Sequence, residues 1–316
     1  MQIRGATYGG VYGGVHGGRY GGVYGGVYGG VHPGAGNGTA LPISDPLEPY
    51  HGELEFQLMA PTVYPEAAWD PNLQAQAMLP MIIEALQNTD LTVPVPPNDE
   101  RTIKSEITSI LSHQNALLNT RAAEILNQSG AFDHYFHNLL SLSGDMHRKT
   151  TVLISLAMQL AGIYGLQEKL RHNRPRPTQT YPGLLPFLPT PPHASYPSNH
   201  ATQAFLVVEL LTRALSPDQE NMEVYLRSLG DRIAFNREIA GLHYRSDTTA
   251  GIGLAGKIAN AVAKVPSVAE LIKDTQSELS SLGVASSSLT AAELQGADSQ
   301  KGSEAENNGQ EEGGQP

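Results

Sequence analysis

Residues 169–200 read KLRHNRPRPTQTYPGLLPFLPTPPHASYPSNH, and residues 236–247 read NREIAGLHYRSD. These two stretches place polar, titratable residues inside an otherwise apolar helical pattern. They contain three runs, namely Lys169-x6-Arg176-Pro177, Pro197-Ser198-Asn199-His200 and Arg237-x5-His243-x3-Asp247. Together the runs supply cations, imidazoles, a hydroxyl and a carboxylate. Such a set is suited to holding a tetrahedral oxyanion and to nucleophilic and acid–base chemistry on it.

Apolar residues recur at three- and four-residue spacing on both sides of these runs, which predicts helices. The expected helices are 67–88, 99–127, 131–142, 146–170, 201–215, 218–241, 247–264 and 266–282. Asn98-Asp99, Asp145 and Pro217-Asp218 are suitable helix starts. No alternating β pattern of useful length is present, so we predict an all-α fold, a helical bundle.

Residues 171–200 interrupt the helical pattern and include eight prolines. Loops of this length inside a compact domain are usually functional or disordered. Because this one contains two of the three runs, we predict an ordered functional loop.

The two ends of the chain differ from the middle in composition. Residues 1–34 contain Tyr-Gly-Gly-Val-like repeats, which indicate a flexible tail or a segment for self-association through tyrosine stacking. Residues 35–66 are rich in proline and predict an extended arm. We expect a helical domain over 67–283 and a disordered acidic tail over 284–316.

Composition limits the partners. A net charge of −11 with only 20 Lys and Arg argues against nucleic acid. The most apolar stretch, 151–166, is short and contains Gln159, so a buried core helix is favoured over a stable membrane span. Cysteine is absent and no signal-like apolar segment follows Met1, so we expect a cytoplasmic protein.

The first run places two cations at the end of a helix. Lys169 ends an apolar helix, and the prolines on both sides of Arg176 restrict its backbone. The planar guanidinium suits a bidentate grip on oxyanion oxygens. The alternative is a solvated basic helix end that the helix dipole favours.

The second run directly precedes the helix expected from Ala201. A helix N-terminus offers free N–H groups and a positive dipole to an anion, although Ser198 can equally be an ordinary N-cap. Asn199 is the non-glycine residue type that best tolerates left-handed backbone geometry.

The third run continues an apolar stripe, which points Arg237 toward the core. A buried arginine needs an anion, either a bound one or an acidic neighbour. Asp247, four residues after His243, can hold one ring nitrogen as N–H. The other nitrogen is then free as a nucleophile or ligand.

The three runs resemble the K-x6-RP, PSGH and SR-x5-H-x3-D motifs of the type 2 phosphatidic acid phosphatase and vanadium-dependent haloperoxidase superfamily. Every charged and imidazole position matches, over residues about 146–256. Asn199 stands at the glycine of PSGH, and Asn236 stands at the serine before the arginine. Residues 190–201 look more like the soluble haloperoxidase branch than like membrane lipid phosphatases.

The resemblance implies a bundle of the acid phosphatase/vanadium haloperoxidase type and a phosphoesterase that needs no cofactor. His243 would be the nucleophile that forms a phosphohistidine, Asp247 would orient it, and His200 would protonate the leaving group. The residues expected to bind the oxyanion are Lys169, Arg176, Ser198, Asn199 and Arg237.

The same residues allow a second interpretation, a vanadium-dependent haloperoxidase with vanadate as cofactor, His243 as the vanadium ligand, and halide and peroxide as substrates. A third is a non-catalytic binding or structural protein that retains the fold. Two weaker hypotheses are zinc at His134, His137 and His147, and a serine-hydrolase triad of Ser198, His243 and Asp247.

Overall fold

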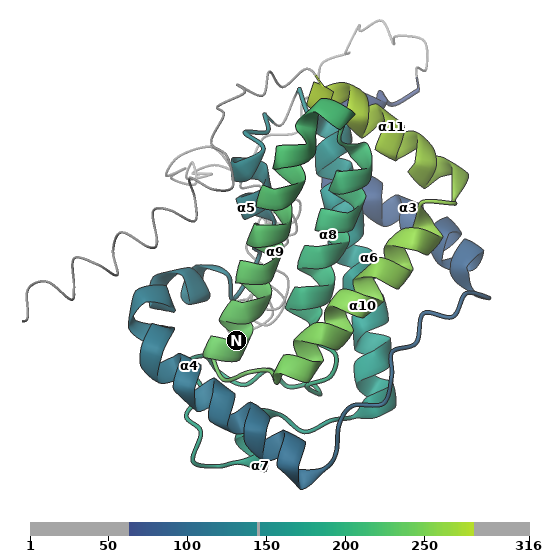
Figure 1. The fold of residues 1–316 in the computed structure, drawn as a ribbon. Coiled ribbons are helices and arrows are strands. Elements are labelled where there is room, and N and C mark those ends of the chain that lie inside the picture. Colours follow the sequence, from purple (N-terminus) through teal and green to yellow (C-terminus); the bar gives the residue numbers. More distant parts are fainter. Residues whose placement is uncertain (1–62, 144–145, 281–316) are drawn as a thin grey trace, which may run out of the picture. The chain divides into compact units, whose positions relative to one another are not determined.

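The computed structural model describes residues 63–143 and 146–280, and every regular element in these ranges is a helix (Figure 1). The all-α fold class predicted from the periodicity is confirmed. The repeat tail 1–34, most of the arm 35–66 and the acidic tail 284–316 lie outside the described residues. The helices are η1 (Glu66–Ala68), α3 (Pro71–Leu86), α4 (Glu100–Asn127), α5 (Asp133–Leu139), α6 (Arg148–His172), α7 (Pro177–Thr180), α8 (Asn199–Ala214), η2 (Pro217–Gln219), α9 (Glu220–Ile239), α10 (Arg245–Val262) and α11 (Pro266–Ser280).

Side-chain caps explain where several helices begin. Asp99 caps α4 as predicted, because its carboxylate accepts a hydrogen bond from the Thr102 N–H at 2.9 Å. The start predicted at Asp218 is wrong, because that residue lies in the short η2 and α9 begins at Glu220. The start predicted at Asp145 lies outside the described residues.

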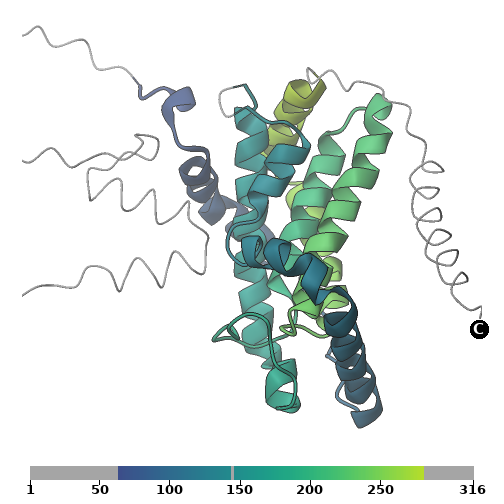
Figure 2. The same cartoon turned by 90° about the vertical axis from the view of Figure 1, so that its left-hand side faces the viewer.

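The helices α6 and α8 form the centre of the bundle. Helix α8 packs against α6, α9 and α10, and α6 packs against α3, α8 and α11 (Figures 1 and 2). The side chains from Thr150 to Ala157 on α6 are all buried, which is typical of a core helix. In the part of the chain that is described, one helical segment, Arg148–Thr180, is long and apolar enough to cross a membrane by length and composition.

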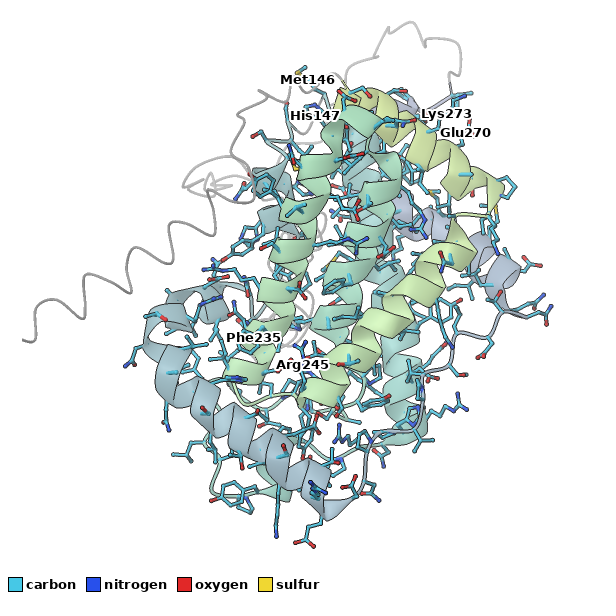
Figure 3. The ribbon with its side chains drawn as sticks, in the orientation of Figure 1. Met146, His147, Phe235, Arg245, Glu270 and Lys273 are labelled. Atoms are coloured by element: carbon cyan, nitrogen blue, oxygen red, sulfur yellow. The ribbon has the colours of Figure 1, made fainter. Side chains whose placement is uncertain are left out.

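One end of this bundle collects the polar runs. Helix α6 ends there, α8 begins there, and α9 turns into α10 there, so residues far apart in sequence become neighbours. Figure 3 shows His147, at the start of α6, and Arg245, at the start of α10, at opposite ends of the bundle. Helix α4 packs along α9 and reaches the same end as Arg245 (Figure 1).

Candidate active site

A left-handed residue turns the chain at the end of α6. Asn173 has φ +46°, a conformation that asparagine tolerates, and its N–H donates to the Lys169 carbonyl at 2.9 Å. The short helix α7, which the proline-rich pattern did not predict, begins directly after Arg176. The loop then runs to Ser198, as the functional-loop interpretation requires.

Lys169 is buried, with only 2% of its surface exposed. Its Nζ donates to the carbonyl oxygens of Ala194 at 2.9 Å and Ser195 at 2.8 Å, and also to that of Pro197. Burial, and then the positive charge of Arg176, lower the pKa of Lys169 well below its usual value. The ammonium therefore fixes the loop that precedes α8, and it does so without a carboxylate partner.

Arg176 joins this loop to the third run. Its Nη1 lies 2.8 Å from the Leu242 carbonyl oxygen and 3.2 Å from Nε2 of His243. On the other edge, Nη2 lies 3.0 Å from Nδ1 of His193. Burial lowers the pKa of the Arg176 guanidinium to about 10, so it stays a cation at neutral pH.

His243 is held by Asp247 as the spacing predicted. Nδ1 of His243 lies 3.1 Å from Oδ2 of Asp247, and a carboxylate only accepts, so Nδ1 carries the proton. Nε2 then keeps its lone pair and faces Arg176. Burial, followed by the charges of Arg176 and Lys169, lowers the pKa of His243 well below its usual value. Since an arginine only donates, Nε2 accepts from Nη1 of Arg176, so the site presents a neutral imidazole whose Nε2 lone pair faces that cation.

Asp247 has further partners that sequence reasoning missed. Oδ1 accepts from Nη1 of Arg174 at 2.7 Å, and Oδ2 accepts from the Ser195 hydroxyl and from the Tyr244 N–H at 3.0 Å. Arg174 lies between Lys169 and Arg176 in the sequence, where its charge has no spacing that distinguishes it from a solvated one. Only the folded chain brings it to Asp247.

Ser198 has the position of an ordinary N-cap. Its Oγ accepts from the Ala201 N–H at 3.4 Å, and its own N–H donates to the Asp247 carbonyl at 2.9 Å. The second bond joins the start of α8 to the start of α10. The free N–H groups of the first turn of α8 therefore lie beside the third run.

Asn199 has helical backbone geometry and does not adopt the left-handed geometry that its residue type tolerates. It is the first residue of α8, and within the described ranges the non-glycine residues with positive φ are Ser141 and Asn173. Its side chain instead packs against Gly165 of α6, where an added Cβ would lie 2.2 Å from Oδ1. That Oδ1 is buried and has no hydrogen-bond partner.

We expect Gly165→Ala to destabilise the protein by about 1–3 kcal/mol, because its methyl group would overlap the Asn199 side chain. With Asn199→Gly present, the same change should be neutral or favourable, since alanine is the better helix former. Urea unfolding of the four proteins in this double-mutant cycle measures the coupling. Equal costs in both backgrounds would contradict the packing argument.

His200 lies at the edge of the site and is partly buried. Its ring stacks on Phe132 with centroids 5.1 Å apart, and Nε2 lies 3.0 Å from the Gln128 carbonyl oxygen. The carbonyl only accepts, so Nε2 is the protonated nitrogen and Nδ1 is available to take up a proton. Burial, and then the charge of Arg237, lower the pKa of His200 to about 3.

Arg237 is buried as its place in the apolar stripe predicted, with 1% of its surface exposed. Nη2 donates to the Ile125 carbonyl at 2.9 Å, and Nε has no hydrogen-bond partner. Glu124, whose charge acts on Arg237, is instead held by Arg232 at 2.6–2.9 Å. The alternative of a structural ion pair for Arg237 is therefore not realised.

The three cations predicted to bind an oxyanion share one property. Within residues 63–143 and 146–280, Lys169, Arg176 and Arg237 are each nearly fully buried, and none forms an ion pair with a carboxylate. Backbone carbonyl oxygens are their main hydrogen-bond acceptors. Buried charges without a counter-ion are costly, so this end of the bundle has a surplus of positive charge that a bound anion would offset.

We expect acid to destabilise the protein between about pH 6.5 and 3 through His200. The unfolded chain takes up a proton below about pH 6.5, whereas the folded His200, with its pKa of about 3, does not. This contribution to stability is present above pH 6.5 and is lost as the pH falls. Since the ring is partly exposed, the cost should be about 1 kcal/mol or less per pH unit.

Urea unfolding at a series of pH values compares the wild type with His200→Gln, which should have the shallower slope. His134→Gln is the control, because that histidine lies on α5 and contacts Asn127. Parallel slopes for the wild type and His200→Gln would contradict the assignment.

The structure gives less support to the zinc-site and serine-hydrolase hypotheses. No group of three or more histidine, cysteine or acidic residues in the described part of the chain is placed to hold a metal ion. The serine next to His243 is Ser195, whose Oγ lies 3.5 Å from Nδ1, whereas Ser198 caps α8. Both serine hydroxyls are occupied by these structural contacts.

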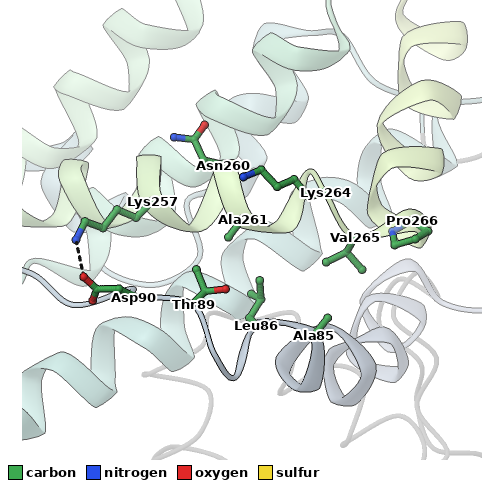
Figure 4. A pocket seen from close by; sticks show the side chains of 10 residues that line it. All are labelled: Ala85, Leu86, Thr89, Asp90, Lys257, Asn260, Ala261, Lys264, Val265 and Pro266. Atoms are coloured by element: carbon green, nitrogen blue, oxygen red, sulfur yellow. Dashed lines mark ion pairs between the residues drawn. The ribbon is translucent and has the colours of Figure 1, made fainter.

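A surface hollow lies elsewhere, between the end of α3 and the end of α10 (Figure 4). Its volume is about 450 Å³, and Lys257 lies across part of it, with Nζ 3.9 Å from Oδ2 of Asp90. None of the eight predicted site residues lines it.

Comparison with known proteins gives a partial structural match. No protein-family model matches the sequence, and no curated protein matches it. Among the solved structures, one match is the crystal structure of the first bacterial vanadium-dependent iodoperoxidase, with a TM-score of 0.44 and 18% sequence identity. The match covers 55% of this chain and 53% of that one, so the chain spans about half the length of that protein.

Proposed function

We propose that this chain is a phosphoesterase that hydrolyses a phosphate monoester through a phosphohistidine on His243. One observation carries the proposal: Lys169, Arg176 and Arg237 are buried cations that have no carboxylate partner among the described residues, and Nη1 of Arg176 lies 3.2 Å from Nε2 of His243, whose lone pair faces it. A phosphate monoester brings two negative charges and would offset this surplus. Their placement supports positioning of the phosphoryl group in front of the nucleophile.

In the first step, Nε2 of His243 attacks phosphorus in line and the bond from phosphorus to the ester oxygen breaks. Asp247 keeps the proton on Nδ1 and stabilises the positive charge that develops on the ring. The three cations stabilise the charge on the equatorial oxygens, which is the main task in phosphoryl transfer.

His200 is the proposed acid for the leaving group. Its pKa of about 3 leaves it neutral at pH 7 in the absence of an anion. A dianion in the site would raise that pKa by direct attraction and favour a proton on Nδ1. The proton passes to the departing alkoxide, so a neutral alcohol leaves.

In the second step, water attacks the phosphohistidine and its proton passes to Nδ1 of His200. The bond between phosphorus and Nε2 breaks, and inorganic phosphate is released. His200 is again protonated and His243 is again neutral, so the cycle closes with one water consumed for each ester.

The second candidate is a vanadium-dependent haloperoxidase, because a site that stabilises the phosphoryl transition state would also hold vanadate, its analogue. The residues fit such a group: Nε2 of His243 carries the lone pair of the ring, which here accepts from Nη1 of Arg176, and the unpartnered Nε of Arg237 is a donor for an oxygen. The strongly lowered pKa of His243 favours this role, since only a neutral imidazole is a ligand. Bound vanadate would supply activation of peroxide for halide oxidation.

The third candidate, a non-catalytic protein, has no specific support, because the complete set of cations, histidines and carboxylate is assembled. We infer small-molecule substrates for either enzyme. A cytoplasmic location and self-association through the N-terminal repeats stay predictions.

Two assays of the purified protein distinguish the candidates. The first measures hydrolysis of 4-nitrophenyl phosphate with vanadate as inhibitor, and the second measures halide oxidation by peroxide after vanadate loading. A phosphatase should show turnover that vanadate inhibits competitively and EDTA leaves unchanged. Halide oxidation without phosphatase activity would favour the second candidate, and activity that requires zinc or magnesium would contradict both.

A further inference from the structure

Arg174 differs from the other buried cations of this site. It bridges two carboxylates, with Nη1 2.7 Å from Oδ1 of Asp247 and Nη2 3.1 Å from Oε2 of Glu106 on α4. Among the residues that the structure describes, Lys169, Arg176 and Arg237 have no such partner. Arg174 is therefore already neutralised by the protein, which makes it a poor candidate for binding an oxyanion.

The surroundings of Arg174 restrict its orientation. The guanidinium carbon lies 4.0 Å from the centroid of the Tyr244 ring, at the distance of a cation–π contact. Besides its bond to Asp247, Nη1 donates to the Ser246 hydroxyl at 2.7 Å, and only 7% of the residue's surface is exposed. Its planar fork is thus fixed in one place.

Glu106 connects this arginine to the helix that carries Asp247. Its Oε1 accepts from the Ser246 N–H at 2.6 Å, and its Oε2 accepts from the Ser246 hydroxyl at 3.0 Å. Ser246 directly precedes Asp247 in the first turn of α10. The carboxylate of Glu106 therefore fixes both the arginine and the backbone next to the aspartate.

The two oxygens of Asp247 have separate partners as a result. Oδ1 is held by Arg174, and Oδ2 accepts from Nδ1 of His243 at 3.1 Å. A carboxylate is free to rotate about its last bond unless both oxygens are held. Arg174 holds Oδ1, while the Ser195 hydroxyl and the Tyr244 N–H hold Oδ2, so the carboxylate is fixed with Oδ2 directed at Nδ1. The proton therefore stays on Nδ1, and the lone pair stays on Nε2.

We propose that Arg174, with Glu106 as its counter-ion, is a positioning residue that orients Asp247 and thereby selects the Nδ1–H tautomer of His243. This inference rests on the proposed role of His243 as nucleophile or ligand. It assigns Arg174 to the orientation of the imidazole and leaves the binding of substrate oxygens to the other cations.

The test compares Arg174→Gln and Arg174→Lys with the wild type and with Arg171→Gln. Arg171 is the matched control, because it lies at the same helix end and pairs with Glu168 at the surface. One readout is the tautomer of His243, from ¹⁵N NMR of histidine-labelled protein without substrate. The other is steady-state kinetics with 4-nitrophenyl phosphate, which gives kcat and KM separately.

For Arg174→Gln we expect a mixture of His243 tautomers and a kcat lower by about 10- to 100-fold, the usual loss when an outer partner of a reactive histidine is removed. KM should change by less than about threefold, because ground-state binding is retained. Arg174→Lys should recover part of kcat, since it keeps the charge but not the fork. Arg171→Gln should match the wild type.

A pure Nδ1–H tautomer with wild-type kcat in Arg174→Gln would overturn the proposal, and so would a change confined to KM. Melting temperatures identify a variant that fails to fold. If Arg174→Gln fails to fold, Arg174→Lys and Glu106→Gln are measured instead. The wild-type tautomer and the wild-type kcat in both variants would overturn the proposal. If the wild type hydrolyses no phosphate ester, the proposed function fails, while the tautomer comparison still tests the role of Arg174.

Discussion

Replacing His243 by alanine is expected to lower phosphate-ester turnover by about 10³-fold or more, because the variant has no nucleophile in front of the cations. Nε2 of His243 is the nitrogen that faces Arg176, and its partner Asp247 prepares it as a neutral base. The residual rate would come from charge stabilisation alone. Steady-state hydrolysis of 4-nitrophenyl phosphate measures the loss, and acid-quenched protein from labelled substrate measures the phosphohistidine directly.

A folded protein is required for this comparison, so circular dichroism and the melting temperature accompany the assay. His134→Gln serves as the control, since it removes a histidine that lies on α5 and contacts Asn127. Full turnover in a folded His243→Ala protein would remove His243 from the nucleophile role and redirect attention to His200.

Phosphate or vanadate is expected to raise the melting temperature of the wild type by several degrees. An anion that binds the folded state alone stabilises it by about 2.7 kcal/mol at 100 times its dissociation constant. A domain of this size gains about 2–4 °C per kcal/mol. The physical reason is the charge of Lys169, Arg176 and Arg237, which are buried and form no ion pair with a carboxylate among the described residues, so a bound anion would stabilise them.

Arg237→Met distinguishes the gain from anion binding from a change in the stability of the anion-free protein. The change removes a buried, unpaired charge and one hydrogen bond to the Ile125 carbonyl, so the melting temperature without anion should be similar or higher. The gain from phosphate should fall, because a charge-assisted contact contributes about 1.5–3 kcal/mol. Differential scanning calorimetry with and without phosphate measures both quantities.

Arg227→Met is the matched control on the same helix, since Arg227 is 41% exposed and pairs with Glu209 and Glu223. Its anion-induced gain should equal that of the wild type. A wild-type gain in Arg237→Met, or no gain in the wild type at millimolar phosphate, would contradict an oxyanion site.

The helices could be predicted from the sequence because apolar spacing and helix caps involve residues that are close together in the chain. Three- and four-residue apolar spacing predicted the all-α class, and Asp99 marked the start of α4 through a cap within its own first turn. The incorrect helix predictions occur where very short helices form. Residues 217–219 form η2 before α9, and α7 forms inside the proline-rich loop, because three or four residues carry too little periodicity to read.

Some features of the candidate site could also be predicted from local spacing, and others could not. The pairing of His243 with Asp247 follows from four-residue spacing, and the burial of Arg237 follows from its apolar stripe. The environment of Asn199 does not follow from its residue type. Its side chain lies against Gly165, which is 34 positions earlier on another helix, and no local pattern encodes this contact.

The sequence by itself determined the helical class, the positions of the polar runs and the residue types available for oxyanion chemistry, because these depend on spacing along one chain. Only the tertiary structure decided which charges are compensated. Arg174 and Arg176 are two residues apart, yet Arg174 meets Asp247 and Glu106, while Arg176 meets backbone carbonyls and His243. The physical reason is that electrostatic partners are set by distance in space and by burial, which arise only when α4, α6, α8 and α10 pack together.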